Sequence, residues 1–228
     1  MRRHIITSIF LALICGQMAQ GKQAKPLSKS RGQNATAIKV YPARGKRIRI
    51  VAGAKRTLVT LTDDISGCLE LFEPRSPNRI FKEPLVVNVI DRVRKDDKYY
   101  LVLLAEANSN CNVEGLCGRQ GDHTLIWLKL GAGLKLEEKK AAVIDDCQAR
   151  INVVALNGAK DAGSKVIYLP DRYSDVDAKM EGPIIKLASG KLTIEYGNML
   201  DDDVRTLSQL VYDRKFPEQG FVITTTKK

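Results

Sequence analysis

Apolar and polar residues alternate with a period of two along much of the chain, as expected for strands with one buried face. The clearest example runs from Lys191 to Tyr196, where Leu, Ile and Tyr alternate with Lys, Thr and Glu. From Arg47 to Val51, Arg alternates with Ile, which predicts a strand with a basic outer face. Residues 125–130 are apolar at positions of both parities, so we expect a central strand with Trp127 in the core.

Further strands are predicted where short apolar or alternating runs end in Gly, Asn or Asp turns. They are Thr57–Thr62, Leu69–Phe72, Leu85–Val93, Tyr99–Ala107, Leu134–Glu137, Ala141–Ile144, Ile151–Leu156, Val166–Leu169 and Phe221–Thr226. Residues 201–212 fit either a helix or a strand, and the alternation favours the strand. The expected fold class is all-β and mainly antiparallel, with at most one short helix. The architecture is a β-sandwich or a meander-like barrel, with a small β-propeller as a further option.

The N-terminus has the features of a cleavable export signal. Met1-Arg2-Arg3 precedes an apolar run of about eleven residues, too short to span a bilayer, and small residues follow at Ala19 and Gly21. We expect cleavage after Gly21, with cleavage after Ala19 as the alternative. A lipoprotein anchored through Cys15 is disfavoured because bulky Ile14 precedes the cysteine. The chain is therefore predicted to be secreted or periplasmic, with no transmembrane segment.

Charge divides the remaining chain into two parts. Between Lys22 and Arg56 there are eleven Lys and Arg residues and no acid, whereas the chain from Thr57 onward carries 24 basic and 26 acidic residues. The predicted organisation is a signal peptide at 1–21, a basic flexible arm at 22–45 and a single β domain at 46–228. Uncompensated positive charge attracts polyanions, which makes Lys46, Arg47 and Arg49 candidate binding residues.

Four cysteines remain after signal cleavage, an even number that suggests disulfides in an exported protein. Proximity in sequence favours Cys111–Cys117, which leaves Cys68–Cys147 by elimination. A zinc site built from all four is disfavoured, because zinc ligands usually come as cysteine pairs two to four residues apart. The Asp-rich segments at 171–177 and 201–203 could offer oxygen ligands to calcium, but they lack EF-hand spacing and are interpreted as solvated turns, so no metal and no cofactor are predicted.

Residues 108–123 form the most distinctive segment, a long Asn- and Gly-rich loop between two predicted strands. Such loops are often recognition surfaces, so Glu114, Arg119 and Asp122 are candidate polar contacts. His123 is the only histidine after signal cleavage and a weak catalytic candidate. The alternative interpretation of His123 is a surface residue at the start of a strand.

Three functions are compatible with these features. The favoured one is a secreted or periplasmic binding protein that engages an anionic glycan, a lipid or envelope polymer, or a protein partner. Export makes nucleic acid an unfavoured partner. The alternatives are an extracellular hydrolase that uses carboxylates or His123, and a structural or accessory envelope protein.

Overall fold

The computed structural model describes residues 37–73, 76–82, 85–109, 117, 121–160, 167, 169, 185–200 and 203–227. These residues belong to one compact unit, 36–228, and the other unit, 1–35, lies outside the described residues. The predicted signal peptide and most of the predicted arm are therefore not described. Residues 39–43, which the charge pattern assigned to the arm, form a strand of the β unit.

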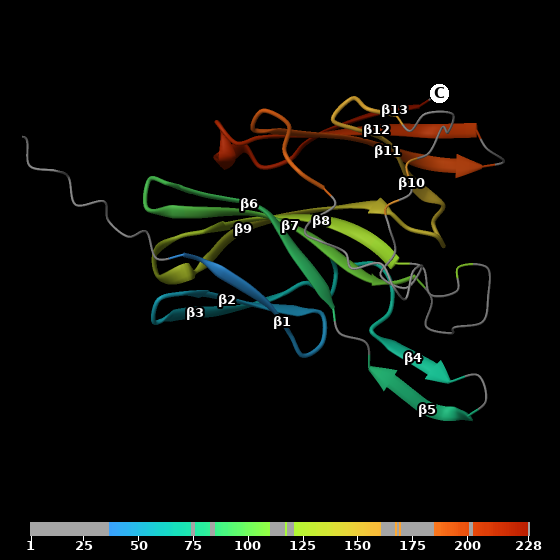
Figure 1. Cartoon of the computed structure of the whole chain (residues 1–228), viewed down its shortest axis with the longest axis horizontal. Coiled ribbons are helices and arrows are strands. Elements are labelled where there is room, and N and C mark those ends of the chain that lie inside the picture. Colours follow the sequence, from blue (N-terminus) through green and yellow to red (C-terminus); the bar gives the residue numbers. More distant parts are fainter. Residues whose placement is uncertain are drawn as a thin grey trace, which may run out of the picture. The chain divides into compact units, whose positions relative to one another are not determined.

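Thirteen strands in the described part of the chain form antiparallel sheets in which neighbours in sequence pair (Figure 1). The first sheet contains β1 (Lys39–Ala43), β2 (Arg47–Ala52) and β3 (Lys55–Thr60). A two-stranded sheet contains β4 (Glu70–Glu73) and β5 (Ser76–Lys82). The central sheet contains β6 (Val86–Lys95), β7 (Lys98–Asn108), β8 (Gly121–Leu130) and β9 (Leu136–Asp145). The last sheet contains β10 (Ile151–Leu156), β11 (Lys191–Leu200), β12 (Asp203–Asp213) and β13 (Val222–Lys227).

The central sheet is apolar on both faces and separates two cores. On β7, Leu101 and Leu103 face the β1–β3 sheet, where they pack with Ile48 and Ile50. The alternate residues of β7 and β8, including Trp127, pack against the β10–β13 sheet. The two cores make a stack of three layers, with β6–β9 in the middle (Figure 1).

The expected all-β, antiparallel fold is confirmed, and of the two main architectures the structure has the sandwich. No closed sheet forms among the described strands, so the meander-like barrel was wrong, although each larger sheet is itself a meander. The apolar run 125–130 lies in a central strand as predicted, and 203–213 is a strand rather than a helix. Residues 134–137 and 141–144, predicted as two strands, lie largely in the single strand β9.

Hairpin turns follow from residues that tolerate positive φ. Asp96 and Asp97, at φ 51° and 58°, join β6 to β7. Asn157 and Gly158, at φ 50° and 79°, form the turn that the sequence signal Asn-Gly predicts after β10.

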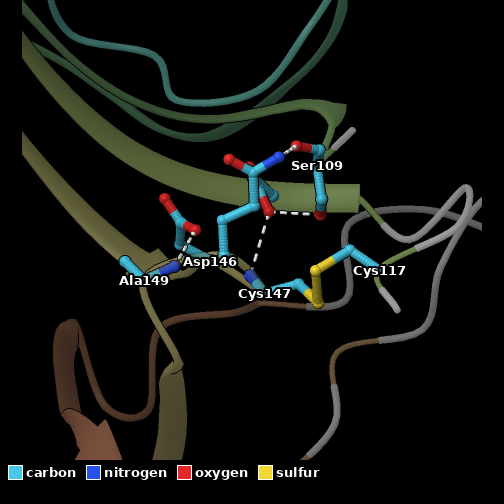
Figure 2. Close-up of a disulfide and its surroundings, with 7 residues drawn as sticks. Ser109, Cys117, Asp146, Cys147 and Ala149 are labelled. Carbon is cyan, nitrogen blue, oxygen red and sulfur yellow. Dashed lines mark hydrogen bonds between the residues drawn. A yellow bond between two sulfur atoms is a disulfide. The ribbon is translucent and has the colours of Figure 1, made fainter. Parts of the chain in front are cut away.

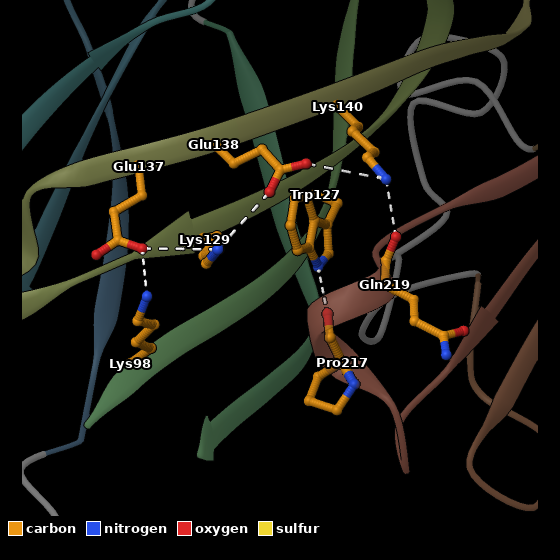
Figure 3. Close-up of polar contacts among 8 residues, drawn as sticks. All are labelled: Lys98, Trp127, Lys129, Glu137, Glu138, Lys140, Pro217 and Gln219. Carbon is orange, nitrogen blue, oxygen red and sulfur yellow. Dashed lines mark hydrogen bonds and ion pairs between the residues drawn. The ribbon is translucent and has the colours of Figure 1, made fainter. Parts of the chain in front are cut away.

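A short 3-10 turn, η2 (Pro217–Gln219), fastens the last sheet to the central one (Figure 3). The indole Nε1–H of fully buried Trp127 donates to the carbonyl of Pro217 at 3.0 Å. Lys140 donates to the carbonyl of Gln219 at 2.8 Å, and its ammonium lies 5.4 Å from the Trp127 ring centroid. The polar atoms of Trp127 and Lys140 thus tie β8 and β9 to the turn between β12 and β13.

A buried polar contact joins the same two sheets. Tyr212 is fully buried and donates its hydroxyl to the Asp91 carboxylate at 2.9 Å, and the Arg214 guanidinium lies 3.5 Å from the other oxygen. Burial, followed by the nearby Asp91 charge, raises the pKa of Tyr212. The tyrosine therefore stays a hydrogen-bond donor to Asp91.

Within the described part of the chain, no helix has the length and apolar character needed to cross a bilayer.

Candidate functional site

The outer face of the β1–β3 sheet is a basic surface that the strand alternation builds. Ile48 and Ile50 point into the core and are fully buried, so the intervening Arg47 and Arg49 point outward. The antiparallel register aligns three outward rows across the sheet. These rows are Lys39–Val51–Arg56, Tyr41–Arg49–Leu58 and Ala43–Arg47–Thr60. We call these nine residues the basic face.

Four cations lie on the basic face without a counter-charge among the residues that the structure describes. None of Lys39, Arg47, Arg49 and Arg56 forms an ion pair with another residue that the structure describes. Arg47 donates from Nε to the carbonyl of Arg44 at 2.7 Å, which steadies its side chain on the sheet. The sequence from 37 to 60 contains no acid, so the strands themselves supply no internal neutralisation. Such a surface attracts anions.

The middle row of the basic face adds apolar area to this charge. Tyr41 is 40% exposed and Leu58 is 51% exposed, two of the five large apolar residues most exposed in the described chain. The Arg49 guanidinium lies 5.6 Å from the Tyr41 ring centroid, a cation–π distance. The basic face therefore offers both cations and amphipathic side chains to a partner.

Lys46, a predicted binding residue, is turned away from the basic face. Its ammonium donates to the carbonyl of Ile65 at 2.8 Å and is partly buried. Burial lowers the pKa of Lys46, and the charge of Asp122 opposes that effect. Of the three predicted cations, Arg47 and Arg49 lie on the basic face, whereas Lys46 makes its contact inside the protein.

A second polar group lies at the end of the central sheet, where β7 and β8 meet the loop. Asp122 is only 1% exposed, and its Oδ1 accepts hydrogen bonds from the Ser109 hydroxyl and, at 3.2 Å, from the backbone N–H of Cys147. Burial raises the pKa of Asp122 to about 6, while the hydrogen bond from Ser109 opposes the shift. Asp122, predicted as a polar contact for a ligand, is thus directed into the protein.

The disulfide beside Asp122 differs from both predicted pairings (Figure 2). Cys117 is bonded to Cys147, so the pairings Cys111–Cys117 and Cys68–Cys147 were wrong. Proximity in sequence favoured the short loop, but the turn after β9 places Cys147 against Asp122 at the start of β8 and Gln148 against Ser109 just after β7. Cys68 is disulfide-bonded as well. Its backbone N–H donates to the carbonyl of Asn108.

His123 is buried rather than at the surface. Its side chain is 1% exposed, and Nδ1 lies 3.2 Å from the Asp145 carboxylate. Nε2 has no hydrogen-bond partner among the described residues. The surface placement expected from sequence was wrong, because packing of β8 between two layers covers even the end of the strand. A general base must be within reach of its substrate, and the ring of His123 is covered. The exposed basic face therefore supports a binding function more strongly than His123 supports a catalytic one.

The remaining predicted contacts of the loop, Glu114 and Arg119, lie outside the described residues, as does Cys111. No group of three or more metal-ligating side chains comes together in the described part of the chain. The carboxylates and His123 at the end of the central sheet are thus separate polar contacts, not a metal centre of the described residues.

Sequence reasoning missed the residues that supply the remaining charge and the exposed apolar area of the basic face, namely Lys39, Tyr41, Arg56 and Leu58. The signal was present: Lys39 and Tyr41 alternate with apolar residues in 38–42, and Arg56 and Leu58 alternate with Thr57 and Val59. That alternation would have placed them on one face only if the pairing of the three strands had been known.

The chain matches no protein-family model, no curated protein and no solved structure.

Proposed function

We propose that this chain is a secreted or periplasmic binding protein that engages an anionic partner through the basic face. The observation that carries the proposal is the row arrangement of Lys39, Arg47, Arg49 and Arg56, four outward cations without an ion pair among the described residues. A disulfide at Cys117–Cys147 is compatible with export. The basic run that begins at Lys22 leads into the same sheet and adds charge of the same sign.

Electrostatic binding of this kind has a measurable salt dependence. When cations neutralise anionic groups on a polymer, counterions are released, and the affinity falls as salt rises. For a duplex polyanion, each neutralised group adds about 0.9 to the slope of log affinity against log salt. Three basic-face contacts would therefore account for a slope of about 3.

The test measures binding of the chain from Lys22 to dextran sulfate at several salt concentrations. The variant Arg47→Gln/Arg49→Gln/Arg56→Gln is expected to bind more weakly and to lose most of that slope. A matched control neutralises three exposed lysines around the last sheet, Lys160, Lys186 and Lys227, with the same change in net charge. Equal loss in both variants would mean that net charge, not the basic face, causes binding, and the proposal would be wrong.

A truncated chain separates residues 22–36 of the predicted arm from the basic face. A version that begins at Ala37 removes residues 22–36 but keeps β1 whole, because β1 begins at Lys39. Binding that survives this truncation and disappears in the triple variant places the interaction on the sheet. Binding that disappears only with the truncation would assign it to the arm instead.

A further inference from the structure

We propose that the anionic partner of the basic face is a lipid surface, which the face contacts with its cations and with Tyr41 and Leu58. This inference rests on the proposed function and specifies its partner. It starts from the composition of the middle row, Tyr41–Arg49–Leu58, which crosses all three strands. Cations in the two flanking rows surround that row on the same face.

The exposed apolar residues distinguish a membrane from a soluble polyanion. A soluble polymer needs only cations, and Leu58 at 51% exposure and Tyr41 at 40% exposure give it little to bind. A lipid interface provides anionic headgroups beside hydrocarbon, so cations and apolar side chains both gain contacts there. Tyrosine in particular suits the headgroup level, where its ring is apolar and its hydroxyl remains hydrated.

The arrangement of the side chains fits a planar surface. Same-face residues on a strand are about 7 Å apart, twice the rise of about 3.4 Å per residue, and adjacent strands lie about 4.8 Å apart. The three rows therefore place the flanking cations on both sides of Tyr41 and Leu58. Because the inward residues Ile48, Ile50 and Val59 are almost fully buried, the core holds these strands in place. The basic face therefore has this arrangement in the protein without a membrane.

The outward side chains of the β1–β3 sheet can contact a membrane without taking part in the packing of the inward ones. Leu58 points away from the core, so its removal leaves the packing of Val59 and Ile48 unchanged. Arg49 lies over the Tyr41 ring, and this contact keeps charge and aromatic surface together at the centre of the face. Lipid binding would therefore depend on Leu58 and Arg49 separately, through hydrocarbon contact and through charge.

The experiment compares vesicles with a soluble polyanion, using the chain from Lys22. Co-sedimentation is measured with vesicles of phosphatidylcholine alone, with vesicles that also contain phosphatidylglycerol, and binding is measured in parallel to dextran sulfate. Leu58→Ser is expected to weaken binding to the anionic vesicles about tenfold and to leave dextran sulfate binding unchanged. Arg49→Gln should weaken both. The matched control Val222→Ser, at a residue 52% exposed on β13, should change neither.

A fluorescence measurement reports insertion directly. Tyr41→Trp places an indole on the basic face, and its emission should shift to the blue on anionic vesicles and be quenched by lipids with brominated chains. Trp127 also fluoresces but is fully buried. Its contribution to the emission is measured with the parent chain, which lacks the second tryptophan.

The outcomes separate this inference from the function on which it rests. If the chain binds dextran sulfate but Leu58→Ser has no effect on vesicle binding, the lipid inference is overturned and the anionic-polymer function stands. If the chain binds neither vesicles nor dextran sulfate, the proposed function fails, and the lipid inference fails with it. Selective loss of vesicle binding in Leu58→Ser supports both.

Discussion

The buried carboxylate of Asp122 makes the stability of this fold depend on pH, and the variant Asp122→Asn tests that dependence. Burial raises the pKa of Asp122 to about 6 from 3.8. The folded protein thus holds a proton that the unfolded chain releases between about pH 4 and pH 6. Stability must fall as pH rises through that interval and level off above it.

The size of the effect follows from the shift. A difference of about two pKa units, at about 1.4 kcal/mol per unit, corresponds to a loss of about 3 kcal/mol between pH 4 and pH 7. Asparagine has an amide oxygen in place of the carboxylate oxygen. That oxygen can accept the hydrogen bonds from Ser109 and from the Cys147 N–H, but the side chain cannot ionise. The free-energy difference between Asp122→Asn and the parent should therefore be small near pH 4 and should grow by about 3 kcal/mol towards pH 7 in favour of the variant.

The assay is urea unfolding at several pH values with the disulfides intact, followed by the fluorescence of Trp127, which is fully buried in the folded chain. The control Asp63→Asn removes a carboxylate from the surface. A difference between Asp122→Asn and the parent that stays constant from pH 4 to pH 7 would refute the reasoning. It would mean that the carboxylate is hydrated or paired in the folded protein and pays no cost for burial.

Two further predictions concern the contacts that join the last two sheets. Gly220→Ala should destabilise the chain by more than about 2 kcal/mol, because Gly220 has φ +64° and a Cβ would lie 2.9 Å from the Trp127 ring; an unchanged urea midpoint would contradict the close approach. Tyr212→Phe should cost about 1–3 kcal/mol, because it removes a hydrogen bond to the buried Asp91 carboxylate. The control Tyr41→Phe lies at an exposed residue, and an equal effect of the two hydroxyl deletions on unfolding by urea would argue against the buried contact.

The local pattern carried most of the information about secondary structure. Period-two alternation identified the strand with Arg47 and Arg49 outside and Ile48 and Ile50 inside, and the structure has that strand. The apolar residues of both parities around Trp127 identified a strand buried on both faces. These predictions succeed because the side chains of a strand alternate between two faces whatever the partner strands are.

The pairing of strands decided what a local pattern cannot contain. Lys39, Arg49 and Arg56 come from three strands, and only the register of β1, β2 and β3 makes them one surface. Lys46 belongs to the same basic run, yet the turn before β2 directs its ammonium to the carbonyl of Ile65. A charge run gives the sign of a surface, whereas the fold determines which of its members face a partner.

The sequence by itself determined the strand-rich class, the antiparallel character and the inward and outward faces of the clearest strands. The tertiary structure alone decided the three-layer stacking, the bond between Cys117 and Cys147, and the burial of Asp122 and His123. The physical reason is the distance in sequence over which each feature is determined. Alternation acts between neighbours in sequence, but a disulfide or a buried carboxylate depends on which distant segments meet. Cys117 and Cys147 are 30 residues apart in sequence, with Cα atoms 5.7 Å apart.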